Sequence, residues 1–369
     1  MIHKARETMT ARERVLRTFA HEKTDRVPIG YEANPGIHMR LAAALGIPDG
    51  DAERVRRALG VDTRGVAAPY IGPALFPEKA GRRVDPLMGS YTRWVGHGSG
   101  GYWDFCDFPL QGARDEAIAA YPVPDADDFD YAAAAESLAR CGDNAVYIGS
   151  PGAGDIINST GMVMGMEDAL CNLQTGHEAT LHYIDRRLRW QLAMLERLLA
   201  ACKGRVDFMW LGEDLGTQHA PMISTELFRR ALRPRHQAYI DLAKACGIPV
   251  MIHTCGSSSW AYEDFIEMGV AGVDTLQPEA ACMSPRYLKD TFGGRLAFRG
   301  CVSTAQLAFG TSGDVTSLVR GTLGVMMPGG GYHFAPTHAI QDNTPVENVL
   351  AMYQAAHQFG VYTETIAPP

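Results

Sequence analysis

Ile248–Ser258 reads Ile-Pro-Val-Met-Ile-His-Thr-Cys-Gly-Ser-Ser, and this stretch indicates both the fold and the chemistry. An apolar run typical of a buried strand ends at His253, and Gly256 then turns the chain. Side chains two positions apart leave the same face of a strand, so we expect His253 and Cys255 to lie side by side. An imidazole and a thiol so placed suit a zinc ion; the alternative is that they only pack or cap there.

The composition predicts a folded protein with little attraction for polyanions. Hydrophobic residues make up 46% of the 369 residues, which is enough for a sizeable core. The net charge of -8 and the pI near 5.8 argue against nucleic acid or an anionic membrane as the main partner. No stretch is long and apolar enough to span a bilayer, and the N-terminus lacks the apolar core of a signal peptide. With eight cysteines that show no paired spacing, the sequence predicts a cytoplasmic protein with reduced thiols.

Short apolar runs alternate with longer amphipathic segments along the chain. Leucine and isoleucine recur at three-to-four spacing in Thr180–Ala200, which is typical of a helix with one buried face. Further helices are predicted at Thr10–His21, Ser224–Ala245, Trp260–Met268, Asp314–Met326 and Pro345–Gly360. Strands are predicted at Arg26–Tyr31, Val66–Tyr70, Ala145–Gly149, Phe208–Leu211, Val250–Thr254, Val273–Leu276, Leu296–Arg299 and Tyr332–Ala335. Eight strands separated by helices favour an α/β fold, a (β/α)8 TIM barrel that forms one domain over residues 1–369.

One region departs from this alternation. Gly72–Asp130 is rich in glycine, proline and aromatic residues. We expect an insertion near the N-terminal third of the chain, with short strands of its own, that covers the mouth of the barrel. A partner-binding or merely structural excursion is the alternative, and a homodimer contact is one such role.

The residues after each predicted strand carry the candidate chemistry, because catalytic groups of TIM barrels sit at the C-terminal strand ends. Glu213 and Asp214 follow the fourth strand, and adjacent carboxylates there are unfavourable unless they bind something. Helix capping by Asp214 is the alternative. Cys301 follows the seventh strand and is a rival thiol ligand at the same rim.

His338 lies just after the eighth predicted strand. In a closed barrel the end of that strand can reach an ion held by the fifth. His253, Cys255 and His338 would then leave a fourth position open, which is typical of catalytic zinc. The alternative is that His338 is a loop histidine with satisfied hydrogen bonds.

Three stretches together resemble the uroporphyrinogen decarboxylase superfamily over nearly the whole chain. They are Thr10–Ala20 with Asp25-Arg-Val-Pro28, His253-Thr-Cys-Gly256, and Phe334-Ala-Pro-Thr-His-Ala-Ile-Gln-Asp-Asn-Thr-Pro-Val-Glu-Asn348. The resemblance implies a (β/α)8 barrel. The true decarboxylases carry an Arg-rich loop after the first strand that binds substrate carboxylates, whereas the corresponding stretch here offers only Arg40.

The chain is more similar to the zinc-dependent methyltransferases of that superfamily, which move a methyl group to or from a corrinoid, folate or thiol carrier. Their third zinc ligand, a cysteine in a Pro-x-Cys segment, falls on His338. The resemblance implies a methyltransferase or demethylase with Zn²⁺, a small methylated substrate, and a corrinoid or tetrahydrofolate as methyl carrier. Asp214 and Gln218 would then orient the substrate, and Glu213 is a candidate fourth ligand. Asp62 and Arg64 are candidate substrate-binding residues.

Two other functions stay open. A decarboxylase-like lyase acting on a carboxylated substrate would use Asp62, Arg64 and Asp214 without metal. A non-catalytic corrinoid- or folate-binding subunit is the second. The chain has no Asp-x-His-x-x-Gly cobalamin motif, so a corrinoid would have to arrive free or on a separate protein.

Overall fold

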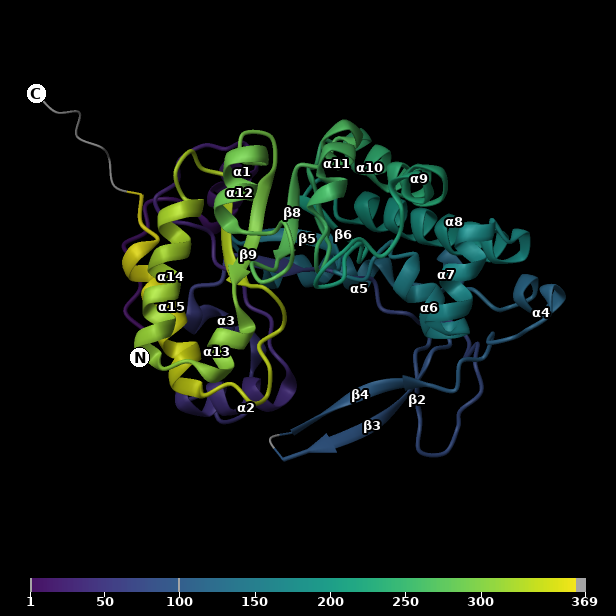
Figure 1. Cartoon of the computed structure of the whole chain (residues 1–369). Helices are drawn as coiled ribbons and strands as arrows, with labels where there is room; N and C mark the ends of the chain where they lie inside the picture. The colour runs from purple at the N-terminus through teal and green to yellow at the C-terminus, as the bar shows by residue number, and fades with distance from the viewer. Residues whose placement is uncertain (1, 99, 363–369) are drawn as a thin grey trace, which may run out of the picture.

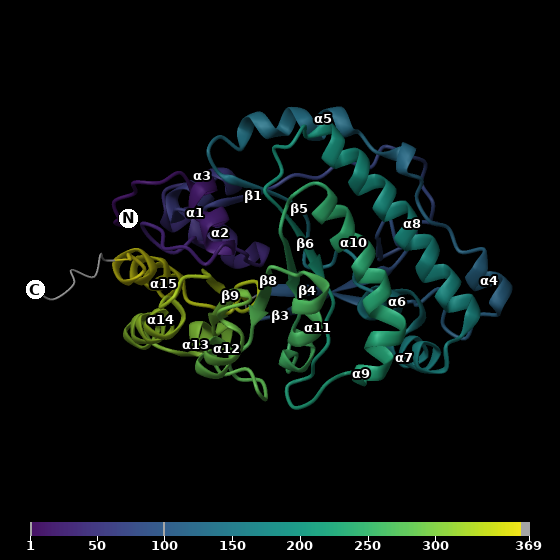
Figure 2. The same ribbon diagram turned by 90° about the horizontal axis from the view of Figure 1, so that it is seen from above.

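The computed structural model describes residues 2–98 and 100–362, so residues 1, 99 and 363–369 of the predicted single domain lie outside the described part. The fold is α/β and is built on a curled seven-stranded sheet in the order β1-β5-β6-β7-β8-β9-β10, in which every neighbouring pair is parallel (Figures 1 and 2). The strands are β1 (Thr63–Gly65), β5 (Ala145–Gly149), β6 (Phe208–Gly212), β7 (Val250–His253), β8 (Gly272–Leu276), β9 (Ala297–Val302) and β10 (Tyr332–Pro336). The last six match predicted strands, because their apolar residues are buried as the sequence pattern requires.

The first two predicted strands need correction. Arg26–Tyr31 makes only isolated bridges, a parallel one between Ile29 and Phe334 and an antiparallel one between Arg26 and Val361, so the sheet has seven regular strands where eight were predicted. Pro28 has no N–H to donate, and the Ile29 N–H is taken by the Asp62 carboxylate at 2.7 Å. The segment still bonds to both ends of the sheet, since Gly30 N–H donates to the Phe334 carbonyl and Asp62 N–H donates to the Ile29 carbonyl. The second predicted strand, Val66–Tyr70, is also misplaced, because the strand in this region is β1, which ends at Gly65.

Helices cover the outer side of the curled sheet (Figure 2). They are α1 (Ala11–Phe19), α2 (Pro35–Ala44), α3 (Ala52–Leu59), α4 (Asp115–Ala119), α5 (Tyr131–Ser137), α6 (Ile157–Met164), α7 (Met166–Thr175), α8 (Glu178–Ala201), α9 (Thr225–Leu227), α10 (Arg233–Ala245), α11 (Tyr262–Met268), α12 (Pro285–Phe292), α13 (Thr304–Phe309), α14 (Ser312–Met326) and α15 (Val346–Phe359). The predicted helices are present, and α1 begins as expected with a Thr10 side chain that accepts the Glu13 N–H. The helix predicted at Ser224–Ala245 is composite, with a π-helical turn at Phe228–Leu232 directly before α10. No helix among the described residues is both long and apolar enough to cross a bilayer.

A second, antiparallel sheet lies within the predicted insertion. It consists of β2 (Arg83–Val84), β3 (Tyr91–His97) and β4 (Gly100–Cys106), and it projects from the body as a ribbon (Figure 1). Its centre is the cross-strand pair of Trp94 and Trp103, whose rings meet edge-on at 5.5 Å. Its tip reaches the loop after β10, because a Cβ added at Gly100 would lie 2.7 Å from Asp342 Oδ2. That this region covers the site stays a prediction.

The Gly100 contact makes the position of the ribbon testable. A valine at this position cannot fit beside Asp342, whose Oδ1 also accepts the Ile37 N–H at the start of α2. We expect Gly100→Val to lift the ribbon tip and to speed limited proteolysis within residues 83–106 several-fold. Gly98→Val is the matched control, since a Cβ there meets no atom within 4 Å. Equal cleavage rates for the two variants would contradict the contact.

Candidate metal centre

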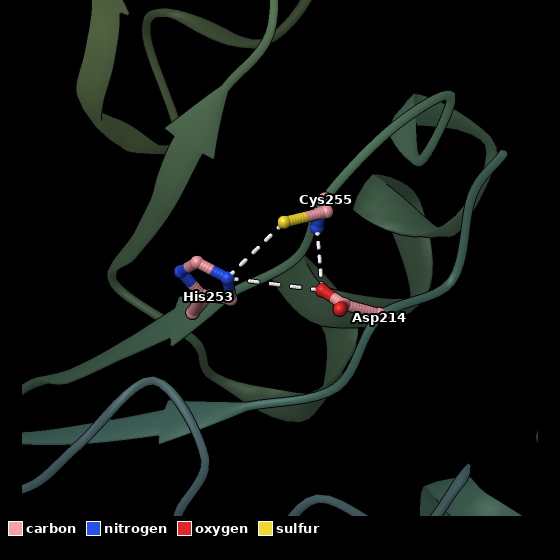
Figure 3. A group of neighbouring side chains, drawn as sticks. All are labelled: Asp214, His253 and Cys255. Atoms are coloured by element: carbon pink, nitrogen blue, oxygen red, sulfur yellow. Dashed lines mark hydrogen bonds and ion pairs between the residues drawn. The ribbon is translucent and has the colours of Figure 1, made fainter. Parts of the chain in front are cut away.

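The ends of β6 and β7 bring together three side chains of types that can bind a metal ion. Asp214, His253 and Cys255 each offer a ligand atom, and these atoms lie within 4.8 Å of one another (Figure 3). The Cys255 Sγ is 3.3 Å from His253 Nε2, and His253 Nε2 is 3.7 Å from Asp214 Oδ1. The β6–β7 register, which pairs Gly212 with His253, places Asp214 beside Cys255 two residues further along each chain. The predicted neighbours His253 and Cys255 are therefore joined by a carboxylate from the adjacent strand.

The Asp214 carboxylate is held on both oxygens. Oδ1 accepts the backbone N–H of Cys255 at 2.9 Å, and Oδ2 accepts a hydrogen bond from Asn158 Nδ2 on α6 at 2.8 Å. The Asp214 side chain remains partly exposed. These two bonds fix the carboxylate next to the thiol and the imidazole, so its orientation does not depend on capping a helix of its own.

His253 is anchored through its other ring nitrogen. Nδ1 lies 2.9 Å from Asp274 Oδ2 and 2.7 Å from Thr275 Oγ1, both on β8. Burial would lower the pKa of His253, but the hydrogen bonds with Asp274 and Cys255 raise it well above its ordinary value. Burial raises the pKa of the Cys255 thiol, which the neighbouring His253 partly offsets. Asp274 was not predicted from the sequence, although an aspartate within the apolar run Val273–Leu276 is a signal that could have identified it.

A buried ion-pair network lies behind Asp274. Arg299 on β9 places Nη1 2.5 Å from Asp274 Oδ1, and its Nη2 pairs with Glu32. The guanidinium also lies over the Trp210 ring, 4.7 Å from its centroid. Burial would raise the pKa of Asp274, but the charge of Arg299 and the hydrogen bond from His253 hold it well below its ordinary value. Arg299 and Glu32 were not predicted from the sequence either; an arginine in the otherwise apolar strand β9 is the signal for Arg299.

Glu213 points away from this cluster. Its Oε2 accepts the Ile156 N–H at 2.8 Å, its Oε1 accepts the Ile157 N–H at 3.0 Å, and His236 Nε2 lies 3.2 Å from Oε2. Because consecutive side chains of an extended segment leave opposite faces, Glu213 and Asp214 cannot both face the same site. The structure therefore places the predicted catalytic Glu213 at the buried start of α6 and does not bring it to the candidate ligands.

The burial of Glu213 predicts a pH dependence of stability. Burial raises its pKa from 4.5 to about 8, although the two backbone N–H groups at the start of α6 oppose this. Unfolding then releases a proton between these values, so the stabilising contribution is complete below pH 4.5 and is lost as pH rises through 8, at up to about 1.4 kcal/mol per pH unit. The free energy of unfolding, measured with urea from pH 5 to 8, should therefore fall less steeply with pH in Glu213→Gln than in the unaltered chain. Glu226→Gln, at an exposed position on α9, should leave the slope unchanged, and identical slopes for Glu213→Gln and the unaltered chain would contradict the assignment.

Three other predicted rim residues lie outside the cluster. His338 is exposed, and its Nδ1 lies 3.4 Å from Gln341 Nε2. Gln218 is exposed, and its backbone carbonyl accepts the Ala281 N–H. Cys301 is 1% exposed, and burial raises the pKa of its thiol. Among residues 2–98 and 100–362, the third candidate ligand beside His253 and Cys255 is therefore Asp214, whereas the sequence suggested His338 for that role.

Asp62 and Arg64 take part in structural ion pairs. Asp62 is 1% exposed, with Oδ1 2.5 Å from Arg14 Nη1 and Oδ2 2.6 Å from Arg26 Nη1. Arg64 pairs with Glu53 on α3 at 2.6 Å and donates to two backbone carbonyls. Their donors and acceptors are thus occupied within the fold, and the structure does not bring either residue to the cluster.

The donor set fits a zinc ion. Imidazole nitrogen, cysteine sulfur and carboxylate oxygen are the three ligand types that zinc accepts in proteins. The ring nitrogen of His253 that faces the other two donors is Nε2, while Nδ1 is engaged with a carboxylate, as is common for metal-binding histidines. Three protein donors are also the number typical of catalytic zinc sites.

Comparisons with known proteins agree with this architecture. The family model described as uroporphyrinogen decarboxylase (URO-D) matches residues 160–359, more than half of the 369-residue chain, and this region contains all three candidate ligands. A methyltransferase from Methanosarcina mazei has a similar structure, with a TM-score of 0.66 and 16% sequence identity over 95% of this chain and 99% of that one. This likeness establishes a shared fold. Among curated proteins, none matches the chain by sequence.

Proposed function

This chain belongs to the uroporphyrinogen decarboxylase family, and from that premise we propose that it is a zinc-dependent methyltransferase. It moves a methyl group between a small methylated substrate and a corrinoid, folate or thiol carrier. The observation that carries the proposal is the grouping of Asp214, His253 and Cys255 at the strand ends where barrel enzymes hold their catalytic groups. The similar fold of a protein named as a methyltransferase supports it.

We propose that His253 and Cys255 hold the zinc ion and that Asp214 is the third protein ligand. Asp214 is favoured over His338 because its oxygen already lies 3.7 Å from His253 Nε2, whereas the His338 ring lies exposed beside Gln341. When bound, zinc would supply a Lewis-acid centre that lowers the pKa of a coordinated thiol, hydroxyl or water by several units.

The surrounding residues orient the donors and restrict water. Asn158 and the Cys255 N–H hold the Asp214 carboxylate on its two oxygens, which leaves it little freedom to turn away. Behind His253, Asp274 and Arg299 are buried, at 0% and 3% exposed, and Arg299 lies over the buried Trp210 ring. Burial on this side strengthens electrostatic interactions at the donors and excludes competing water from it.

A decarboxylase-like lyase is the second candidate, and the family match favours it. Several substrate carboxylates would need several free cations. Arg299 is already paired with Asp274 and Glu32, and Arg40 donates to the backbone carbonyls of Asp342 and Thr344. Asp62, the carboxylate assigned to this mechanism, is enclosed between two arginines. The methyltransferase proposal therefore ranks first.

Metal analysis with a methyl-transfer assay tests the proposal. Purified protein reconstituted with Zn²⁺ and dialysed is expected to retain about one zinc per chain, measured by plasma mass spectrometry. The zinc-loaded protein should change the visible spectrum of methylcobalamin when a thiol is added, or that of cob(I)alamin when a methylated donor is added. Protein that binds no zinc after reconstitution would overturn the proposal. The assay also includes a separate corrinoid protein as carrier, since the chain has no cobalamin motif of its own.

A further inference from the structure

Resting on the proposed zinc site, we propose that Asp274 is a positioning residue for His253, and that Arg299 and Glu32 fix Asp274 in turn. The Asp274 carboxylate lies against Nδ1 of His253, which directs Nε2 at Cys255 and Asp214. Contacts therefore run without a break from Glu32 at the mouth of the curled sheet, through Arg299 and Asp274, to the candidate ligand His253.

A neutral imidazole exists in two tautomers, with its proton on either Nδ1 or Nε2. Only the form with its proton on Nδ1 offers the Nε2 lone pair to a metal. Asp274 Oδ2 lies 2.9 Å from Nδ1, and an ionised carboxylate can only accept, so it selects that tautomer. The β7–β8 register pairs Asp274 directly with His253, which sets this contact through the backbone.

A local distortion of β8 adds a second contact to the same nitrogen. Asp274 and Thr275 are adjacent, yet both reach Nδ1, which neighbouring residues of a regular strand cannot do because they face opposite sides. The pairing with β9 is irregular between Val273 and Leu276, and Thr275 adopts a φ of +65°, which is rare for a β-branched residue. This strained conformation is held at the point where it serves His253.

Arg299 and Glu32 supply the charge that a buried carboxylate requires. Asp274 is 0% exposed, and an isolated carboxylate at that depth would be strongly unfavourable. Arg299 Nη1 lies 2.5 Å from its other oxygen, and the guanidinium is fixed by Glu32 on one side and the Trp210 ring on the other. Glu32 is one-third exposed and is the outermost residue of this series of contacts, at the mouth of the sheet. Replacing Glu32 should therefore affect His253 through the partly buried Glu32–Arg299 pair and the buried Arg299–Asp274 pair.

The test compares Asp274→Asn with a matched variant at the opposite end of the sheet. Asp207→Asn is the control, because Asp207 is also buried between two arginines, Arg12 and Arg205. Zinc affinity is measured by competition with a chromophoric chelator, below the melting temperature of each variant. We expect Asp274→Asn to weaken zinc binding by about 10- to 100-fold and Asp207→Asn to leave it unchanged. The visible spectrum of the Co²⁺-substituted protein should shift in Asp274→Asn alone.

The outcomes separate this inference from the proposed function. Equal zinc affinity and equal Co²⁺ spectra in Asp274→Asn and the unaltered chain would overturn the positioning role and leave the metal site standing. Failure of the unaltered chain to bind zinc would overturn both. The ¹⁵N shifts of His253 in the zinc-loaded protein give a second readout, in which the Nδ1 resonance should move in Asp274→Asn and stay unchanged in Asp207→Asn. If Asp274→Asn does not fold, Glu32→Gln is expected to weaken zinc binding in the same direction, and no change there would contradict the chain of contacts.

Discussion

Replacing Cys255 with alanine is expected to lower kcat/KM for methyl transfer by about 10³-fold, which corresponds to about 4 kcal/mol of lost transition-state stabilisation. The thiol is the one sulfur donor of the candidate cluster, and it lies 3.3 Å from His253 Nε2. Its loss leaves an imidazole and a carboxylate, which are too few protein donors for a stable catalytic zinc site. The value of kcat/KM from steady-state kinetics and the zinc content, both measured on the same samples, should decrease together.

Cys171→Ala is the matched control, because Cys171 is an exposed free thiol on α7 far from β7 in the chain. It should retain full activity and full zinc content. The decarboxylase candidate gives the opposite expectation, since a metal-free lyase would keep most of its activity in Cys255→Ala. A Cys255→Ala variant with unchanged turnover would therefore contradict the zinc proposal.

The same assay distinguishes the two candidates for the third ligand. Asp214→Asn removes a carboxylate that is already in the cluster, whereas His338→Ala removes an exposed ring outside it. We expect the larger loss of zinc in Asp214→Asn. The reverse order would show that the loop after β10 supplies the ligand and that the family-based prediction for His338 was the better one.

Replacing Asp62 with alanine is expected to destabilise the fold by about 3 kcal/mol, at the lower end of the range for a broken buried ion pair. Arg14 and Arg26 would lose the carboxylate that lies between them, but Arg14 keeps Asp25 and Arg26 keeps Glu7. Loss of the bond to the Ile29 N–H adds to the effect, because this bond ties the 26–31 segment to the sheet. Urea unfolding at neutral pH measures the change.

Asp49→Ala serves as the comparison for Asp62. Asp49 also pairs with an arginine, Arg54, but both side chains are more than half exposed, so no measurable change in stability is expected. If Asp62→Ala were as stable as the unaltered chain but showed a raised KM, Asp62 would be a substrate-binding residue, as the sequence first suggested.

Much of the fold followed from the sequence because six strands are short apolar runs buried within the sheet. The Arg26–Tyr31 segment was mispredicted because its backbone donor at Ile29 bonds to the Asp62 side chain, a partner 33 residues away that no local pattern reveals. The pairing of His253 with Cys255 was predictable because strand periodicity alone sets it. Asp214 joined them instead of Glu213 because only one of two adjacent side chains can face the site.

Residues that act behind the ligands were harder to find. Asp274 and Arg299 lie in apolar strands, and they meet His253 and each other through the pairing of neighbouring strands that are far apart in the sequence. The sequence shows them as isolated charges in hydrophobic runs, which indicates buried pairing but not the partner. His338 shows the opposite case, in which family resemblance assigned a role that the side-chain positions leave as a prediction.

An anomalous difference map at the zinc edge, from crystals of the zinc-loaded protein, would locate the metal and its ligands together. We expect one strong peak bonded to His253 Nε2 and Cys255 Sγ, at about 2.0 and 2.3 Å, with an Asp214 oxygen as the third protein ligand. A map with no peak between these side chains, or with the only peak elsewhere, would contradict the proposed site.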